Sequence, residues 1–342
     1  MNIGVLTGGG DCAGLNAAIR AVVRRAAQDK HTVIGIKNGW LGLIDNDAEP
    51  IDVSRTSGIL SAGGTRLGTS RTNPAKVEQG YDKVLENLRK NKIDSLVVIG
   101  GDDTLSVALE LHKRGIKVVG IPKTMDNDVY GTDFCIGFDS AVSIVMDACD
   151  KLRTTARSHH RVMVLEVMGR TAGWVALIGG MAGGADWILI PEIEVSIEKV
   201  AGQLKRRHEL GKDFSILVVS EAANVPEIQA EAKGSKDAFG HERLEKRGIG
   251  DAVSRELEKR TGYETRVTVL GHIQRGGSPT LTDRILGTRL GVAAVESLLK
   301  NQSGVMVGLH GNAIDTVSLE EVIRNSPRKV DPKLYQLASL FY

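Results

Sequence analysis

The distribution of apolar residues along the chain predicts an alternation of buried strands and amphipathic helices. Short Val/Ile/Leu runs predict strands at 2–7, 32–36, 95–100, 117–122, 161–167, 187–191, 214–221, 265–271 and 304–309. Residues 15–29 and 75–92 have the spacing of amphipathic helices. Strands that are apolar on both faces are typical of parallel sheets covered by helices on each side. The pattern therefore predicts an α/β fold with two doubly wound lobes, each with a parallel sheet flanked by helices.

Composition excludes several classes of protein. The 342 residues are 42% hydrophobic and 25% charged, as in ordinary globular domains. The net charge of +2 does not favour a broad nucleic-acid or anionic-membrane surface. The chain has no run of 18 apolar residues, and its first residues, MNIGVLTGGG, predict a strand instead of a signal peptide. Three cysteines without a CxxC pair indicate reduced thiols, so we expect a cytoplasmic protein. From the net charge and the apolar pattern we expect that it binds neither nucleic acid nor membrane.

The first glycine-rich loop, TGGGDCAG at 7–14, follows a predicted strand and precedes a helix. It satisfies the dinucleotide pattern GxGxxA, which alone is a weak signal. A dinucleotide site also needs an acid after the second strand for the ribose, and residues 36–38 read Ile-Lys-Asn. Asp11 would moreover stand uncompensated beside a pyrophosphate group. An anion-binding loop with the Gly10 backbone near a phosphate is therefore favoured over a nicotinamide site.

The second glycine turn, in VVIGGDDTLSVA at 97–108, places two acids at a predicted helix start. Free N–H groups and the positive helix end attract anions at such a position. A magnesium ion, which phosphoryl transfer requires, explains one of the two carboxylates of Asp102 and Asp103. The other needs an explanation of its own.

The stretch GIPKTMDNDVYGTD at 120–133 holds the densest polar chemistry. Ligands of open α/β sheets bind at the carboxyl ends of strands, and Lys123 and Thr124 come directly after one. Asp126 and Asp128 are candidates for metal binding or for accepting a proton from a hydroxyl group. An Asp/Asn-rich turn is the structural alternative, but it does not explain the lysine and threonine at the strand exit.

Two further strand ends carry positive charge. VMGRTAGW at 167–174 places Arg170 after a strand, and arginine suits forked recognition of phosphate. GHIQRGGSP at 271–279 places His272 and Arg275 before two glycines. Each feature alone is compatible with a structural role, whereas together they favour a ligand site.

Taken together, TGGGDCAGLNAAIR, GGTRLGTSR, GGDDT, PKTMDND, VMGR, SEA and GHIQRGG occur in the order found in the 6-phosphofructokinase family. The resemblance extends from residue 3 to about 310 of this chain. It implies a fold of two unequal Rossmann-like lobes with discontinuous boundaries. The larger lobe, with the phosphoryl-donor and magnesium site, is expected at 1–137 and about 274–325. The smaller lobe, with the fructose 6-phosphate site, is expected at 138–273 and about 326–342.

The resemblance implies transfer of a phosphoryl group to the 1-hydroxyl of fructose 6-phosphate with Mg²⁺. Asp126 corresponds to the general base, and the catalytic set adds Thr124, Arg170, Asp103 and Lys123. Asp102 corresponds to the magnesium ligand. The residues implied to hold the donor are Gly10, Arg71, Thr72, Gly101, Asp102, Asp103 and Thr104. Those implied to hold the sugar phosphate are Thr124, Met125, Asp126, Asp128, Arg161, Met168, Gly169, Arg170, Glu221, Arg266, His272, Ile273, Gln274 and Arg275.

The donor is where the sequence departs from the common ATP-using pattern. Those enzymes resemble GGDGS where this chain has GGDDT, and they have glycine at Lys123. The pair of Asp103 and Lys123 resembles the pyrophosphate-dependent branch. A carboxylate about 4 Å from the α-phosphate of ATP costs about 4 kcal/mol at an effective dielectric of 20, or about a thousand-fold in binding. Pyrophosphate leaves that position empty, so it is the expected donor in a reversible reaction, with ATP as the alternative.

The resemblance also concerns assembly and regulation. Counterparts of Arg161 and Arg266 reach into the site of a neighbouring subunit, which implies a homodimer or homotetramer with shared active sites. The effector cluster of ATP-using members is matched only in part, because Val53 and Leu210 replace basic residues, so weak or absent nucleotide control is expected. The polar stretch 224–248 predicts a loop and helix insertion. A kinase of NAD or lipid and a non-enzymatic sugar-phosphate sensor are the rival functions.

Overall fold

The computed structural model describes residues 1–228, 239 and 248–342, so most of the predicted insertion lies outside the described residues. The described chain forms two compact units. Unit 1 contains residues 1–140, 239 and 275–327, and unit 2 contains residues 141–228, 248–274 and 328–342. Both units are thus discontinuous in sequence. No described helix is long and apolar enough to cross a membrane.

The sheet of unit 1 has seven strands in the order β11-β10-β5-β4-β1-β2-β3. The bounds are β1 Asn2–Thr7, β2 Thr32–Ile36, β3 Ala48–Ile51, β4 Ser95–Gly100, β5 Lys117–Pro122, β10 Val305–His310 and β11 Ala313–Ser318. Its five inner strands are parallel, whereas β3 pairs with β2 and β11 with β10 in antiparallel fashion. Strand order reverses beside β1, since β2 lies on one side of it and β4 on the other. In open α/β sheets the crevice at such a reversal is the usual ligand position.

The sheet of unit 2 has four strands in the order β7-β8-β6-β9, all parallel. The bounds are β6 Val162–Val167, β7 Trp187–Leu189, β8 Ser215–Ser220 and β9 Thr265–Val269. Every residue of β6 and β8 is buried, as expected for inner strands covered on both faces.

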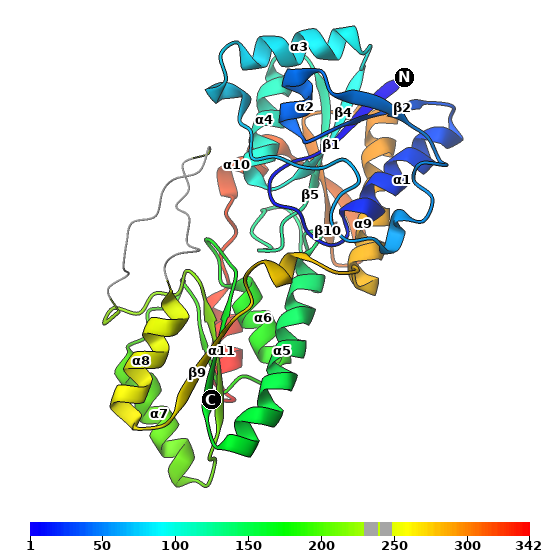
Figure 1. The fold of residues 1–342 in the computed structure, drawn as a ribbon. Helices are drawn as coiled ribbons and strands as arrows, with labels where there is room; N and C mark the ends of the chain where they lie inside the picture. The colour runs from blue at the N-terminus through cyan, green and yellow to red at the C-terminus, as the bar shows by residue number, and fades with distance from the viewer. Residues whose placement is uncertain (229–238, 240–247) are drawn as a thin grey trace. The chain divides into compact units, whose positions relative to one another are not determined.

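Helices cover both faces of each sheet (Figure 1). The helices are α1 Leu15–Gln28, α2 Trp40–Asp45, α3 Gly80–Lys90, α4 Asp102–Lys113, α5 Phe138–His159, α6 Trp174–Ala182, α7 Ile197–Glu209, α8 Ile249–Thr261, α9 Leu281–Leu299, α10 Leu319–Asn325 and α11 Pro332–Ser339. In unit 1, α1 and α9 lie side by side on one face of the sheet (Figure 1), and their approach is close because Gly287 and Gly291 of α9 meet the α1 backbone. In unit 2, α7 and α8 share one core with the sheet.

The predicted α/β fold class is confirmed. The sheet of unit 1 differs from the predicted parallel sheet because its two edge strands, β3 and β11, are antiparallel to their neighbours. All nine predicted strands are present, most within one or two residues of the expected bounds. The structure adds β3 and β11, which the apolar pattern did not predict. β3 has the sequence AEPI, and a proline is tolerated there because an edge strand has one unpaired side. β11 is mostly exposed, so it carries no apolar run.

Candidate functional site

The loops after β1 and β4 meet in unit 1 where the strand order reverses. The N–H of Gly8 donates to the carbonyl of Ile99 at 3.0 Å, which ties the first loop to the end of β4. A Cβ on Gly8 would lie 2.6 Å from the Thr104 methyl group, so only glycine fits under the buried threonine. The two predicted glycine turns therefore contact each other directly.

The guanidinium group of Arg275 packs against Gly10. A Cβ at this position would lie 2.5 Å from Nη1 of Arg275, which also donates to the carbonyl of Asp11 at 3.1 Å. Arg275 was predicted as a sugar-phosphate contact, and the structure places its guanidinium against the glycine loop.

Lys123 lies beneath the same loop and is only 3% exposed. Its Nζ donates to the carbonyls of Gly8 at 2.8 Å and Gly10 at 2.6 Å. Burial lowers the pKa of Lys123 from its ordinary value of 10.5, and the nearby Arg275 lowers it further. Burial also raises the pKa of the neighbouring Cys12 thiol to about 12, so that thiol is neutral. The buried Lys123 Nζ is thus held by two carbonyl groups of the loop.

The two acids of the second turn occupy the first turn of α4, with Gly101 as the N-cap. The Asp102 carboxylate accepts the N–H of Asp103 at 2.9 Å, and the Asp103 carbonyl accepts the Ser106 hydroxyl at 2.7 Å. Thr104 behind them is buried. Carboxylates at this position are favoured by the helix dipole, so the fold holds two negative charges beside the glycine loop.

The segment after β5 is held in shape by Asn127. Its backbone is left-handed, with φ of 53°, and its side chain accepts the N–H of Cys135 at 2.8 Å and donates to the Asp133 carbonyl at 3.2 Å. The Thr124 hydroxyl accepts the N–H of Asp126 at 3.1 Å. Asp126 is partly exposed, whereas Asp128 is 4% exposed. The segment therefore presents one carboxylate and buries the other.

The remaining predicted residues of unit 1 differ in their surroundings. Arg71 is exposed and Thr72 is partly buried, and both follow Ser70, whose carbonyl accepts the Gly9 N–H at 3.0 Å. Met125 is buried with 1% exposure, so it supports the segment as part of the core.

In unit 2, the ends of β6, β8 and β9 bring four predicted residues together. The N–H of Met168 donates to the Gln274 side-chain carbonyl at 2.8 Å, and the N–H of Gly169 donates to the Glu221 carboxylate at 3.2 Å. Gly169 has φ of 151°, a conformation that favours glycine. The buried Nε2 of Gln274 has no protein partner among the described residues.

Arg170 follows this turn and begins a loop anchored by the end of the chain. Glu192 accepts the N–H groups of Gly173 at 3.0 Å and Val330 at 3.1 Å. The Trp174 indole N–H donates to the Arg328 carbonyl at 3.0 Å. His272 and Ile273, in the short helical turn Gly271–Arg275, are exposed.

Arg161 and Arg266 lie at the opposite end of the unit 2 sheet. Arg161 precedes β6, and Arg266 pairs in register with Met163 near the start of that strand. Met168 follows the far end of β6, about 20 Å away at 3.3 Å per residue. Both guanidiniums bind Glu264, with Nη2 of Arg161 at 2.9 Å from its carboxylate. One chain therefore does not bring all the predicted sugar contacts together.

Comparison with known proteins gives a consistent answer. The family model for phosphofructokinase matches residues 2–298. The chain belongs to the phosphofructokinase family. The pyrophosphate–fructose 6-phosphate 1-phosphotransferase of Amycolatopsis mediterranei (strain S699) is 49% identical over 346 residues, covering 100% of both chains. The ATP-dependent 6-phosphofructokinase of Corynebacterium efficiens is 48% identical over 326 residues, covering 94% of each.

Solved structures agree with this assignment. The phosphofructokinase from Saccharomyces cerevisiae superposes with a TM-score of 0.83 at 31% identity, covering 99% of this chain and 46% of that chain. This chain thus spans less than half the length of the yeast chain. The resemblance expected from the sequence motifs is confirmed.

Asp283 is a buried residue of this phosphofructokinase that sequence reasoning missed. It belongs to the first turn of α9 and accepts the N–H groups of Gly137 and Ser140 at 2.8 Å, together with the Ser140 hydroxyl at 2.6 Å. These donors lie at the start of α5, directly after the segment that carries Asp126. Burial raises the pKa of Asp283, and its hydrogen bonds oppose that shift. In the sequence, Asp283 could be interpreted only as an acid in the first turn of a helix, three residues after Thr280. Its partner Ser140 is 143 residues away, and no local pattern predicts that contact.

The family's metal is compatible with the residues present. Among the described residues, no group of three or more His, Cys, Asp or Glu side chains gathers to hold an ion. Mg²⁺ however is commonly bound by one or two carboxylates and the phosphates of the substrate. Asp102, partly exposed at the start of α4, fits that mode.

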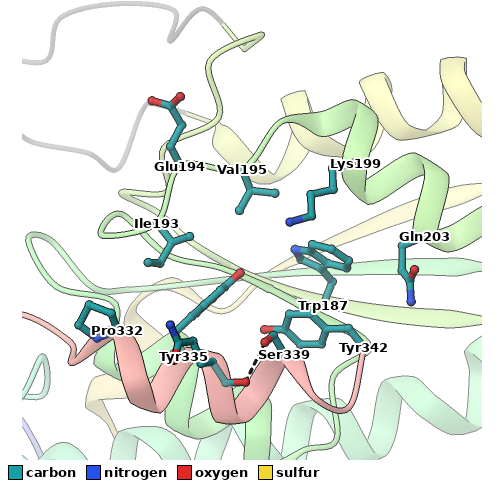
Figure 2. A pocket seen from close by; sticks show the side chains of 11 residues that line it. Trp187, Ile193, Glu194, Val195, Lys199, Gln203, Pro332, Tyr335, Ser339 and Tyr342 are labelled. Atoms are coloured by element: carbon teal, nitrogen blue, oxygen red, sulfur yellow. Dashed lines mark hydrogen bonds between the residues drawn. The ribbon is translucent and has the colours of Figure 1, made fainter.

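One cavity lies apart from all the predicted residues. It has a volume of about 520 Å³ in unit 2, and Figure 2 shows Trp187, Lys199 and Tyr335 on its walls. Tyr342 stacks on Trp187 with ring centroids 4.7 Å apart, and the Tyr335 hydroxyl donates to the Ile188 carbonyl at 3.0 Å. These contacts seat α11 on the edge of the sheet, and we assign the cavity no part in the chemistry.

Proposed function

We propose that this phosphofructokinase transfers a phosphoryl group from pyrophosphate to the 1-hydroxyl of fructose 6-phosphate, in both directions. The observation that carries the choice of donor is Asp103, which sits in the first turn of α4 beside the glycine loop. Overall similarity does not separate the donors, because relatives named for pyrophosphate and for ATP are 49% and 48% identical. The choice between pyrophosphate and ATP therefore depends on the charge of Asp103.

Asp103 discriminates by electrostatic repulsion. An ATP molecule bound with its outer phosphates on the glycine loop needs room for a third phosphate beside this carboxylate. At about 4 Å the like charges cost about 4 kcal/mol with an effective dielectric of 20, which is about a thousand-fold in affinity. Pyrophosphate has no third phosphate, so it escapes the repulsion. Specificity then comes from rejecting the wrong donor.

The other residues of unit 1 supply positioning and charge. Asp126 accepts the proton of the sugar's 1-hydroxyl as general base, and the Thr124 hydroxyl fixes its backbone. Asp102 holds Mg²⁺, which neutralises phosphate charge when bound. Gly10, Thr72, Gly101 and Thr104 offer backbone and hydroxyl donors, with Arg71 as an exposed cation. Phosphoryl transfer needs in-line alignment and charge neutralisation more than covalent catalysis.

Unit 2 supplies the sugar contacts. The residues at the carboxyl ends of its strands hold the sugar ring: Met168, Gly169, Arg170, Glu221, His272, Ile273 and Gln274. The resemblance also implies sugar contacts for Thr124, Met125, Asp126, Asp128 and Arg275 of unit 1, of which Met125 and Asp128 are buried. Arg161 and Arg266 are about 20 Å from Met168 along the same sheet, so we assign them to the 6-phosphate of a neighbouring subunit. The enzyme is accordingly a homo-oligomer in which two copies share each site.

A coupled assay for fructose 1,6-bisphosphate tests the donor. The purified enzyme is expected to be active with pyrophosphate and Mg²⁺ and to have little activity with ATP. Activity with ATP alone would overturn the proposal and leave the ATP-dependent alternative. An absence of product with both donors would exclude the sugar chemistry.

The double variant Asp103→Gly with Lys123→Gly sharpens this test. It removes the carboxylate that repels ATP together with the cation beneath the glycine loop, and the loss of that cation should make pyrophosphate activity collapse. Asp251→Asn, an acid in the first turn of α8 in unit 2, is the control for a lost helix-start charge and should keep pyrophosphate activity. Unchanged pyrophosphate activity in the double variant would contradict the role given to the pair of Asp103 and Lys123.

A further inference from the structure

Four successive carbonyl groups of the glycine loop are held by side chains. Lys123 Nζ donates to Gly8 and Gly10, at 2.8 and 2.6 Å. The Thr69 hydroxyl donates to the Gly9 carbonyl between them, at 2.6 Å. Arg275 Nη1 then binds the carbonyl of Asp11 at 3.1 Å. Two cations and one hydroxyl thus fix the direction of four consecutive peptide groups.

The opposite edges of these peptide groups carry the N–H donors. In a trans peptide the N–H points away from the carbonyl of the same unit, so carbonyls held by the protein turn the following N–H groups the other way. The Gly9 N–H donates to Ser70, but no described residue accepts a hydrogen bond from the N–H groups of Gly10, Asp11 or Cys12. Successive N–H groups next to a left-handed residue such as Gly9 form an anion-binding concavity.

Resting on the proposed function, we propose that Lys123 and Thr69 are positioning residues for the donor: they hold the glycine-loop carbonyls so that the Gly10–Cys12 N–H groups bind pyrophosphate. Thr69 has no role in the predicted site, and Lys123 acts through the loop instead of touching the donor. The ammonium group is almost wholly buried and already donates to two carbonyls, which fits support from beneath. Its charge adds a positive potential under the bound anion.

The arrangement explains why a lysine accompanies Asp103. The Asp103 carboxylate also repels the two phosphates of pyrophosphate, at longer range and more weakly than it would repel a third phosphate. A cation beneath the loop offsets that penalty without occupying space above it. Glycine at position 123 would leave the carbonyls of Gly8 and Gly10 without this donor, and the loop would lose the conformation set for the short donor.

Thr69→Val is the decisive variant, because it removes one hydroxyl and no charge. We expect the KM for pyrophosphate to rise about three- to ten-fold, as for the loss of one hydrogen bond, with the KM for fructose 6-phosphate unchanged. Imidodiphosphate, a pyrophosphate analogue that is not turned over, should bind more weakly by the same factor in calorimetry. Thr69→Ser keeps the hydroxyl and should restore both values.

Thr288→Val is the matched control. It makes the same chemical change in unit 1, where the Thr288 hydroxyl donates to the Arg284 carbonyl within α9 at 2.8 Å. It should leave imidodiphosphate affinity at the wild-type value. Equal weakening by both valine variants would mean a general loss of structure and would overturn the proposal.

Lys123→Met separates geometry from charge. It removes two charge-assisted hydrogen bonds, so the KM for pyrophosphate should rise about ten- to a hundred-fold, more than for Thr69→Val. In the wild type, deprotonation of Lys123 below its ordinary pKa of 10.5 should raise the KM for pyrophosphate at alkaline pH, and Lys123→Met should lack that rise.

The outcomes are distinguishable from failure of the proposed function. If the wild type uses pyrophosphate and Thr69→Val binds imidodiphosphate as tightly as the wild type, the positioning role is wrong and the donor assignment stands. If the wild type does not bind imidodiphosphate or use pyrophosphate, the donor assignment is wrong. A fall in kcat at unchanged KM in Lys123→Met would place the ammonium on the transferred group instead of the loop.

Discussion

The loops of unit 1 that we propose for the donor and the residues of unit 2 that we propose for the sugar are arranged in different ways. In unit 1, the turns after β1, β4 and β5 meet at one edge of one sheet, joined by bonds such as Lys123 to Gly8. In unit 2, the predicted residues divide between the two ends of a parallel sheet. Met168 follows β6, whereas Arg161 precedes it.

The difference follows from the geometry of parallel strands. Residues that follow neighbouring strands share an edge, while a residue before a strand lies a strand length away. A single copy can therefore complete the donor loops but not the full set of sugar contacts. Oligomerisation becomes a requirement of the chemistry in this proposal, and the predictions below test the two halves of that contrast.

The largest effect is expected at Asp126 in the donor half. Asp126→Asn removes the general base and should lower kcat about 10²- to 10⁴-fold in the direction of fructose 1,6-bisphosphate formation. The loops that hold pyrophosphate stay intact, so imidodiphosphate affinity measured by calorimetry should be unchanged. A kcat near the wild-type value would show that another group accepts the proton.

A large effect is also expected from Arg266, which tests sharing between copies. Arg266→Ala should raise the KM for fructose 6-phosphate about ten- to a hundred-fold, as for the loss of a charge-assisted hydrogen bond. Arg206→Ala, an exposed arginine on α7, is the control and should leave the KM unchanged.

Mixing two impaired subunits makes the contrast sharper, provided that activity is assayed at a fructose 6-phosphate concentration near the wild-type KM, where Arg266→Ala alone turns over little substrate. Asp126→Asn and Arg266→Ala subunits, denatured together and refolded, form mixed dimers in about half of the population, and one of the two shared sites in each is then intact. Recovery of about a quarter of wild-type activity is expected for such two-fold sharing. If both residues serve the same copy, no intact site forms and activity does not return.

Much of this architecture was accessible from the sequence because buried strands carry long apolar runs. β4 and β8 are apolar and wholly buried, and both were predicted with the right bounds to within a residue. β3 and β11 were missed because an edge strand is paired on only one side and needs no long apolar run. Most residues of β11 are exposed. The pattern of apolar residues thus predicts the inner strands of a sheet better than its edge strands.

The site divides in the same way between local and distant causes. Residues that follow strands, such as Thr124 and Asp126, are placed by topology and were readable from the sequence. The placement of Lys123 beneath the glycine loop depends on backbone carbonyl groups 115 and 113 residues away, and no local pattern encodes it. The same limit concealed Thr69 and Asp283, whose partners are distant in sequence. The roles of the individual site residues remain predictions.

Asp283 tests how firmly the donor half is built. Asp283→Asn leaves at least one of the donors from Gly137 and Ser140 without a good acceptor, which costs about 1–3 kcal/mol of unfolding free energy. Thermal denaturation should show a lowered Tm, and kcat should fall because α5 begins where the Asp126 segment ends. Asp251→Asn, in the first turn of α8, should change the Tm little because that residue is exposed. An unchanged Tm in Asp283→Asn would show that these bonds are dispensable.

Glu264 gives the smallest expected effect, and it tests the end of unit 2 assigned to a neighbouring subunit. Its carboxylate binds both Arg161 and Arg266, which holds the pKa of Glu264 below its usual value. The Glu264 and Arg266 side chains are exposed to solvent, so Glu264→Gln should change the unfolding free energy little. The carboxylate competes with a sugar phosphate for the same N–H donors, and its neutralisation should lower the KM for fructose 6-phosphate about two- to five-fold, more at low salt than at high salt. A raised KM would mean instead that Glu264 aligns the two arginines for the phosphate, and no change at either salt concentration would argue that this end of the sheet does not bind the sugar phosphate.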